Sequence, residues 1–204
     1  MKRPKKGLKK LETEVAKESK RQAKKIRKVR LMFQDEARFG RINSPQSCWA
    51  PPGVRPSVPC HMVREYTYAY AAVSPSDGVL VYLVLSLWSM PHAMSLFISE
   101  VSLRHPNEFI IMVMDKAGWH KAKDLKVPQN MRIIFLPPFS PELNPAEHLW
   151  EEIREKWFPN QVFNSLSGVV NVLVDALDSL EQSPEKVASI AGFDWVIDLI
   201  LKAA

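Results

Sequence analysis

The chain has 204 residues, of which 46% are hydrophobic, 25% are charged and two are cysteines. This composition suits one globular domain with a sizeable core, and the cysteine spacing forms neither a disulfide framework nor a zinc-ligand pattern. No apolar run is long enough to cross a bilayer, and no signal-peptide core begins the chain. We therefore expect a reduced cytoplasmic protein without membrane contact.

The net charge of +6 is distributed unevenly along the chain. Residues 1–30 hold 14 Lys or Arg and 3 Glu, whereas residues 31–204 hold 14 basic and 19 acidic residues. Such a basic arm binds nucleic acid well, because each cation that neutralises a phosphate releases counterions. The same composition is equally typical of a solvated leader. Residues 8–30 contain no Gly or Pro and should be helical, but their sparse apolar residues favour a connector outside the core.

Beyond the arm, apolar runs and turn residues predict alternating elements. Strands are expected at 29–39, 65–73, 79–87, 109–114 and 131–136, and helices at 94–104, 119–126, 145–158, 165–182 and 184–202. Five prolines make residues 43–61 an irregular loop. Three early strands followed by alternating strands and helices predict an α/β fold, a mixed β-sheet flanked by α-helices. This is also the element order of the ribonuclease-H-like fold. We expect a basic helical arm at 1–30 and one domain at 31–204, whose C-terminal helices occupy about 165–204.

Three carboxylates fall at the ends of predicted core elements. Asp35 lies in the polar end of the first strand, where alternation puts it on one face with Leu31 and Phe33. Asp115 follows the apolar run Phe109–Met114, and Glu147 lies in the first turn of the helix beginning at Pro145. Loops converge at such ends, and ligand sites of open α/β sheets gather there. Several carboxylates in one place suit divalent cations, which prefer oxygen ligands and neutralise the repulsion between the acids. The pattern therefore favours two-metal phosphodiester chemistry.

Each carboxylate also has a purely structural interpretation. Asp35 can end a strand, and Asp115 can accept a hydrogen bond from a following backbone N–H. The run Asn144-Pro145-Ala146-Glu147 resembles a capping box, with Asn144 as N-cap and Glu147 as its partner. Spacing alone leaves both interpretations open.

Four blocks of sequence resemble one known family. Phe33–Gly40 (FQDEARFG), Met114–His120 (MDKAGWH) and Leu136–Trp150 (LPPFSPELNPAEHLW) are similar to the three catalytic blocks of IS630 / Tc1-mariner DDE transposases. Cys48–Pro56 (CWAPPGVRP) resembles the loop between the first strands of these enzymes. The resemblance covers residues 30–160, and its third block argues against a resolvase or a ribonuclease H, which do not carry it.

The resemblance implies a ribonuclease-H-like fold and a DDE triad of Asp35, Asp115 and Glu147 that binds Mg²⁺ or Mn²⁺, with two ions expected. It implies a transposase catalytic domain that performs metal-dependent DNA cleavage and strand transfer. A metal-activated water first attacks a phosphodiester at the end of the transposable DNA element, and the freed 3′-hydroxyl then attacks target DNA. Transposon ends and target DNA would be the partners of a homodimer associated with the nucleoid in the cytoplasm.

Two departures from the family bear on this function. Relatives carry a helix-turn-helix region that recognises the terminal repeats, whereas only the basic arm precedes Asp35 here. We therefore expect recognition from a separate helix-turn-helix subunit, with this chain either the second product of a split reading frame or a truncated remnant. The alternative function is a catalytically impaired remnant that only binds DNA or a partner protein. Lys116 favours that alternative, because relatives often have Asn or Gly there and a lysine can compete with metal for Asp115.

Six residues near the triad are candidates for contact with DNA, since cations and aromatic rings both suit nucleic acid. They are Arg38, Lys116, Trp119, His120, Lys121 and Lys123. The plainer interpretation is that Trp119 packs on the sheet, that the lysines are ordinary surface residues and that Arg38 pairs with Asp35 or Glu36. His120 is also a candidate general base, although two-metal chemistry needs none.

Overall fold

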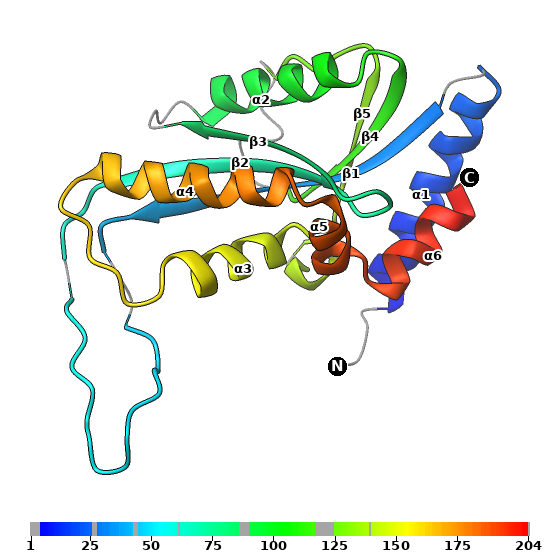
Figure 1. Cartoon of the computed structure of the whole chain (residues 1–204). Coiled ribbons are helices and arrows are strands. Elements are labelled where there is room, and N and C mark those ends of the chain that lie inside the picture. Colours follow the sequence, from blue (N-terminus) through cyan, green and yellow to red (C-terminus); the bar gives the residue numbers. More distant parts are fainter. Residues whose placement is uncertain are drawn as a thin grey trace.

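A computed structural model describes residues 5–25, 28–42, 45–60, 62–85, 90–116, 125–138 and 140–203. One five-stranded sheet forms the centre of the molecule, in the order β3-β2-β1-β4-β5 (Figure 1). Its strands are β1 (Lys28–Gly40), β2 (Tyr66–Ser74), β3 (Val79–Leu85), β4 (Glu108–Met114) and β5 (Met131–Phe135). β2 runs antiparallel to both β1 and β3, whereas β4 runs parallel to both β1 and β5. The predicted mixed sheet is therefore confirmed.

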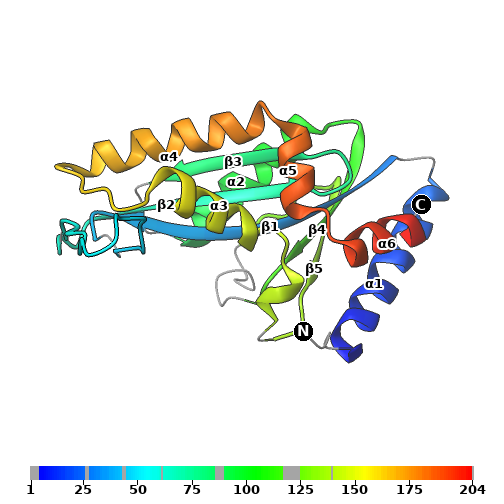
Figure 2. The same ribbon diagram turned by 60° about the horizontal axis from the view of Figure 1, so that its bottom comes forward.

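Helices cover both faces of this sheet. They are α1 (Lys5–Ala23), α2 (Met90–Arg104), α3 (Glu147–Trp157), α4 (Leu166–Glu181), α5 (Pro184–Ala191) and α6 (Asp194–Ala203), with a 3-10 turn at Pro141–Leu143. α2 covers one face, and α3 and α4 cover the other, while α1 and α6 lie side by side at the edge (Figures 1 and 2). No described helix is long and apolar enough to cross a membrane.

Most predicted elements lie close to their observed bounds, with two differences. The single helix expected at 184–202 is two helices, because helical structure is interrupted at Gly192 and Phe193 between α5 and α6. The Gly192 amide donates to the Ala188 carbonyl over 2.7 Å and ends α5. The short helix expected at 119–126 falls largely outside the described residues, which exclude 117–124.

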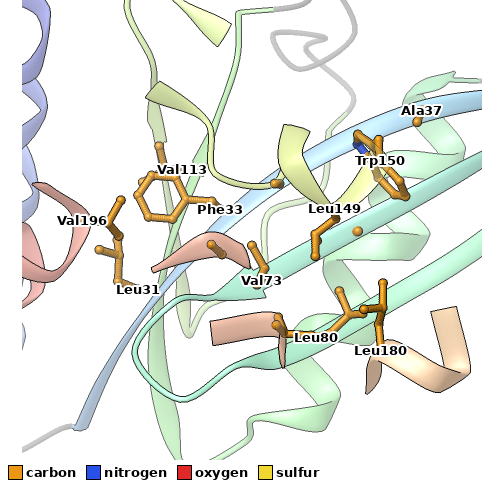
Figure 3. Packing of buried hydrophobic residues seen from close by; sticks show 14 of the residues in the cluster. Leu31, Phe33, Ala37, Val73, Leu80, Val113, Leu149, Trp150, Leu180 and Val196 are labelled. Atoms are coloured by element: carbon orange, nitrogen blue, oxygen red, sulfur yellow. The ribbon is translucent and has the colours of Figure 1, made fainter. Parts of the chain in front are cut away.

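The central strand β1 divides its side chains between two cores. Leu31, Phe33 and Ala37 belong to the larger core, which α3, α4, α5 and α6 complete (Figure 3). Met32 belongs to the smaller core beneath α2. Because successive side chains of a strand point to opposite faces, Asp35 lies on the face covered by α3. The alternation predicted for Leu31, Phe33 and Asp35 is confirmed.

Helix α1 contributes to the larger core. Leu8, Leu11 and Val15 are buried, with 8%, 2% and 0% of their surface exposed. They follow one another at helical spacing, so they form a narrow apolar stripe on an otherwise basic helix. The expectation that this segment lies outside the core is therefore wrong. The boundary at residue 30 between an arm and a domain stays a prediction.

Two connections show how local sequence shapes the fold. The β2–β3 turn ends at Gly78, which has a φ of +68°, and a Cβ there would come within 1.8 Å of the Pro184 carbonyl oxygen. Only glycine fits this position without strain. The proline-rich segment 45–60 has no helix or strand, as predicted, and extends away from the body of the molecule (Figure 1). Trp49 in this segment is fully exposed.

Candidate active site

Asp35 is a nearly buried carboxylate in the middle of the sheet, with 9% of its surface exposed. Its Oδ2 atom accepts a 2.9 Å hydrogen bond from the indole Nε1 of Trp150 on α3. Burial raises the pKa of the Asp35 carboxyl well above its usual range, and the nearby charges of Glu147 and Glu36 raise it further. The hydrogen bond from Trp150 opposes this shift of the pKa only in part.

Asp115 lies at the same level of the sheet as Asp35. β1 and β4 are parallel neighbours in which Phe33 pairs with Val113, and each aspartate comes two residues further along the chain. Asp115 itself follows the last residue of β4 and is exposed. The buried strand β4 thus delivers this carboxylate to the edge where the connections converge, as the sequence pattern predicts.

Glu147 is the first residue of α3 and is half-buried. The predicted capping box is wrong, because the N-cap residue is Ala146, which makes no side-chain cap, and the helix does not begin at Pro145. Asn144 lies one turn earlier, and its Oδ1 accepts from the Ala146 amide over 3.3 Å. Its Nδ2 donates to the Gln34 carbonyl over 3.0 Å. Asn144 therefore fixes the start of α3 against β1 next to Asp35.

The three carboxylates line one cavity of about 360 Å³. Lys116 and Asn144 line it as well, and the walls are formed by Leu136 and the proline-rich turn before α3. The cavity brings together side chains from β1, from the end of β4 and from the start of α3, which lie far apart in the sequence. This convergence is the geometry that the sequence pattern anticipates.

The DNA-contact candidates have different locations. Lys116 lines the cavity of the three carboxylates, whereas Arg38 lines another cavity, with Tyr66. Trp119, His120, Lys121 and Lys123 lie outside the described residues. The expected pairing of Arg38 with an acid is not among the ion pairs of the described residues, and its guanidinium instead stacks on the Tyr66 ring at 4.3 Å.

The donor set of the cavity fits a hard divalent cation, since it consists of carboxylate oxygens whose charges need compensation. Burial and the charges of Glu147 and Glu36 raise the pKa of the Asp35 carboxyl, so a bound cation would stabilise its ionised form. Among the described residues, however, no three His, Cys, Asp or Glu side chains already form a group able to hold a metal ion. Metal binding would therefore require the side chains of the cavity to move closer together.

Two residues important to the site were not assigned to it from sequence. Trp150 is buried, with 1% of its surface exposed, and its bond to Asp35 depends on how α3 lies over β1. Asn144 was expected as a helix cap rather than as a link to β1. The only relevant sequence feature is that both residues belong to the block that ends at Trp150.

Comparisons with known proteins agree with this architecture. The family model described as "DDE superfamily endonuclease" matches residues 30–169. The uncharacterized protein y4pE/y4sA of Sinorhizobium fredii (strain NBRC 101917 / NGR234) is 34% identical over 131 residues, which are 64% of this chain and 96% of that protein. The chain thus belongs to the DDE superfamily endonuclease family.

Solved structures define the fold more closely. The catalytic domain of Mos1 mariner transposase matches with a TM-score of 0.55 at 13% identity, covering 100% of this chain and 97% of that domain. The Mos1 paired-end complex with left transposon end matches with a TM-score of 0.58 at 17% identity, covering 95% of this chain but only 64% of that one. Further matches are Mos1 paired-end complexes with Mn and with Mg. The ribonuclease-H-like fold and the resemblance to IS630 / Tc1-mariner transposases are confirmed.

Proposed function

We propose that this chain is a transposase catalytic domain that cuts DNA and joins the cut strand to target DNA with Asp35, Asp115 and Glu147 as its catalytic carboxylates. The supporting observation is that these three side chains, from separate elements, line a single cavity. The family model and the fold make DNA the expected substrate of that cavity.

The chemistry consists of two displacements at phosphorus. In the first, water attacks a phosphodiester at the end of the transposable DNA element, the P–O3′ bond breaks, and a 3′-hydroxyl and a 5′-phosphate result. In the second, this 3′-hydroxyl attacks a target phosphodiester, and a new P–O3′ bond replaces the one that breaks. Two Mg²⁺ or Mn²⁺ ions held by the three carboxylates would activate the attacking oxygen and neutralise charge on the phosphate. The Mos1 complexes with Mn and with Mg support this choice of ion.

The residues around the carboxylates would orient the site. Trp150 holds Asp35 from the side of α3, and Asn144 fixes the turn before Glu147 to the backbone of β1. Lys116 lies in the same cavity, where its ammonium group would contact a phosphate oxygen of the bound strand. We propose a homodimer acting on transposon ends and target DNA, with a separate helix-turn-helix subunit supplying end recognition.

A nicking assay on supercoiled plasmid DNA with Mn²⁺ tests the catalytic assignment without requiring end recognition. The variants Asp35→Asn, Asp115→Asn and Glu147→Gln should each reduce nicking at least a hundredfold. Glu151→Gln is the matched control, because Glu151 lies one turn after Glu147 on α3, is exposed and pairs with His148 at 2.8 Å. Retention of activity in any of the three triad variants would exclude that residue from the site.

The second candidate function is an impaired remnant that only binds DNA or a partner. It is favoured by two observations: the described carboxylates form no ready metal-binding group, and a lysine lines their cavity. Calorimetric titration with Mn²⁺ separates the two functions. Binding that is lost in Asp35→Asn and kept in Glu151→Gln supports the enzyme, whereas the absence of binding by the unaltered chain supports the remnant.

A further inference from the structure

A second cavity of about 360 Å³ lies at the other end of α3. Arg38 from β1 and Arg154 from α3 line it, together with the rings of Phe39 and Tyr66 and with Gln161. It combines two cations with aromatic walls, and neither the triad nor the family assignment gives it a role.

The two arginines are held in place without an acidic partner among the described residues. Arg38 stacks on Tyr66 at 4.3 Å from the guanidinium carbon to the ring centroid, and Arg154 stacks on Phe39 at 5.1 Å. By contrast, Arg30, Arg41 and Arg104 each pair with a carboxylate. A guanidinium that stacks through its face keeps the N–H groups along its edge free for an anion.

The edge of this cavity is also fixed by hydrogen bonds. The Asn160 side chain, just after α3, accepts from the Gln46 amide over 2.8 Å and donates to the Gln46 carbonyl over 3.2 Å. Because Gln46 lines the cavity, these two bonds join the start of segment 45–60 to the end of α3. The cavity is therefore a built feature of the fold rather than a gap between unconnected segments.

Both elements that carry the arginines also carry the candidate catalytic acids. Arg154 follows Glu147 by seven residues of helix, and Arg38 follows Asp35 by three residues of strand, so each arginine lies about 10 Å further along its element. Because successive strand residues point to opposite faces, the Arg38 side chain leaves β1 on the face opposite to that of Asp35 and lines the cavity from that side. The two elements run in the same direction, since Trp150 bonds to Asp35 while Phe158 stacks near Phe39. A DNA strand that runs along both elements from the acids would thus bring a phosphate a few nucleotides further on to the arginines.

We propose that the cavity between Arg38 and Arg154 is a phosphate-binding subsite for the DNA strand held at the carboxylates, a few nucleotides from the cleaved bond. Each guanidinium binds phosphate oxygens through paired N–H groups. The assignment rests on the proposed function, because the triad defines where the strand is cleaved.

Fluorescence anisotropy with short single-stranded DNA, without divalent metal, tests this subsite independently of catalysis. The slope of log affinity against log salt falls by about 0.7 for each lost phosphate contact on a single strand. The double variant R38Q/R154Q should therefore lower the slope for a hexanucleotide by about 0.7 to 1.4. R104Q is the matched control, because Arg104 is already paired with Glu100 and Glu181.

The variant R38K/R154K controls for folding, since it keeps both charges, and its slope should stay near that of the unaltered chain. An unchanged slope in R38Q/R154Q, or no hexanucleotide binding by the unaltered chain, would overturn the subsite. Loss of the slope in R38Q/R154Q together with full nicking activity in the triad variants would instead contradict the proposed function and leave a nucleic-acid subsite standing.

Discussion

Trp150 of α3 and Asp35 of β1 are joined by a hydrogen bond of 2.9 Å from the indole nitrogen to the carboxylate, at a place where both residues are buried. Trp150→Phe would keep much of the apolar contact but remove the donor. We expect a loss of about 1–3 kcal/mol in the free energy of unfolding and weaker Mn²⁺ binding, because Asp35 loses its fixed orientation. Thermal unfolding and calorimetric titration measure the two effects. Unchanged Mn²⁺ affinity would show that Trp150 is only a core residue.

Asp35→Asn should separate stability from activity. The carboxylate is buried and close to the charges of Glu147 and Glu36, so its ionised form is unfavourable in the metal-free fold. A neutral amide keeps the acceptor for Trp150 and removes the repulsion. At neutral pH the metal-free variant should unfold at a higher temperature, by about 2–4 °C for each kcal/mol of repulsion removed, while nicking is lost. A lower unfolding temperature than that of the unaltered chain would contradict this account.

The interactions of Glu108 predict that the stability of the protein depends on pH in the acidic range. The hydrogen bond from Arg30 and the ion pair with Lys28 lower the pKa of Glu108 to about 2 from its usual 4.5. A carboxylate whose pKa is lower in the folded state adds stability above the unfolded pKa, and this stability is lost as the pH falls from about 4.5 to 2. Glu108→Gln should therefore destabilise the protein by about 1.5–3 kcal/mol at pH 7. The difference in unfolding free energy should shrink toward pH 2, and a difference independent of pH would exclude the ionic contribution.

Leu11 tests whether α1 is part of the fold. It has 2% of its surface exposed and lies in the larger core. Leu11→Ala should cost about 2–5 kcal/mol in the free energy of unfolding, since it leaves a cavity. Lys17→Ala on the exposed side of the same helix is the control and should change stability by less than about 0.5 kcal/mol. Equal effects of the two substitutions in chemical denaturation would show that α1 is not packed on the core.

The sheet could be predicted from sequence because its strands are short apolar runs bounded by turn residues. Phe109–Met114 is entirely apolar and is buried on both faces, and the alternation around Phe33 gave the correct face for Asp35. The role of α1 was missed because three buried side chains are enough to attach a helix whose composition is dominated by charge. Tertiary contact, rather than composition, decides whether such a helix packs.

The candidate site was predicted in part for a similar reason. Asp115 and Glu147 were placed at the ends of elements and lie there, whereas Asp35 lies inside β1, which continues to Gly40. All three acids line one cavity. The packing of α3 across β1 cannot be predicted from the sequence of either segment alone. The hydrogen bonds of Trp150 and Asn144 to β1 could therefore not be predicted. The prediction of a capping box was wrong because a tight turn stabilised by Asn144 occupies the residues that the motif assigns to the helix.

The central position of β1 has a consequence for how the site fluctuates. It pairs with β4 from Lys28 to Phe33 and with β2 from Phe33 to Gly40, whereas Asp115 comes after the last residue of β4. Amide hydrogens of β1 that bond to β2 near Asp35 should therefore exchange with solvent more slowly than the amide of Asp115, which should exchange through local opening. The Asp35 carboxylate would then keep its position, whereas Asp115 would change its position when DNA binds.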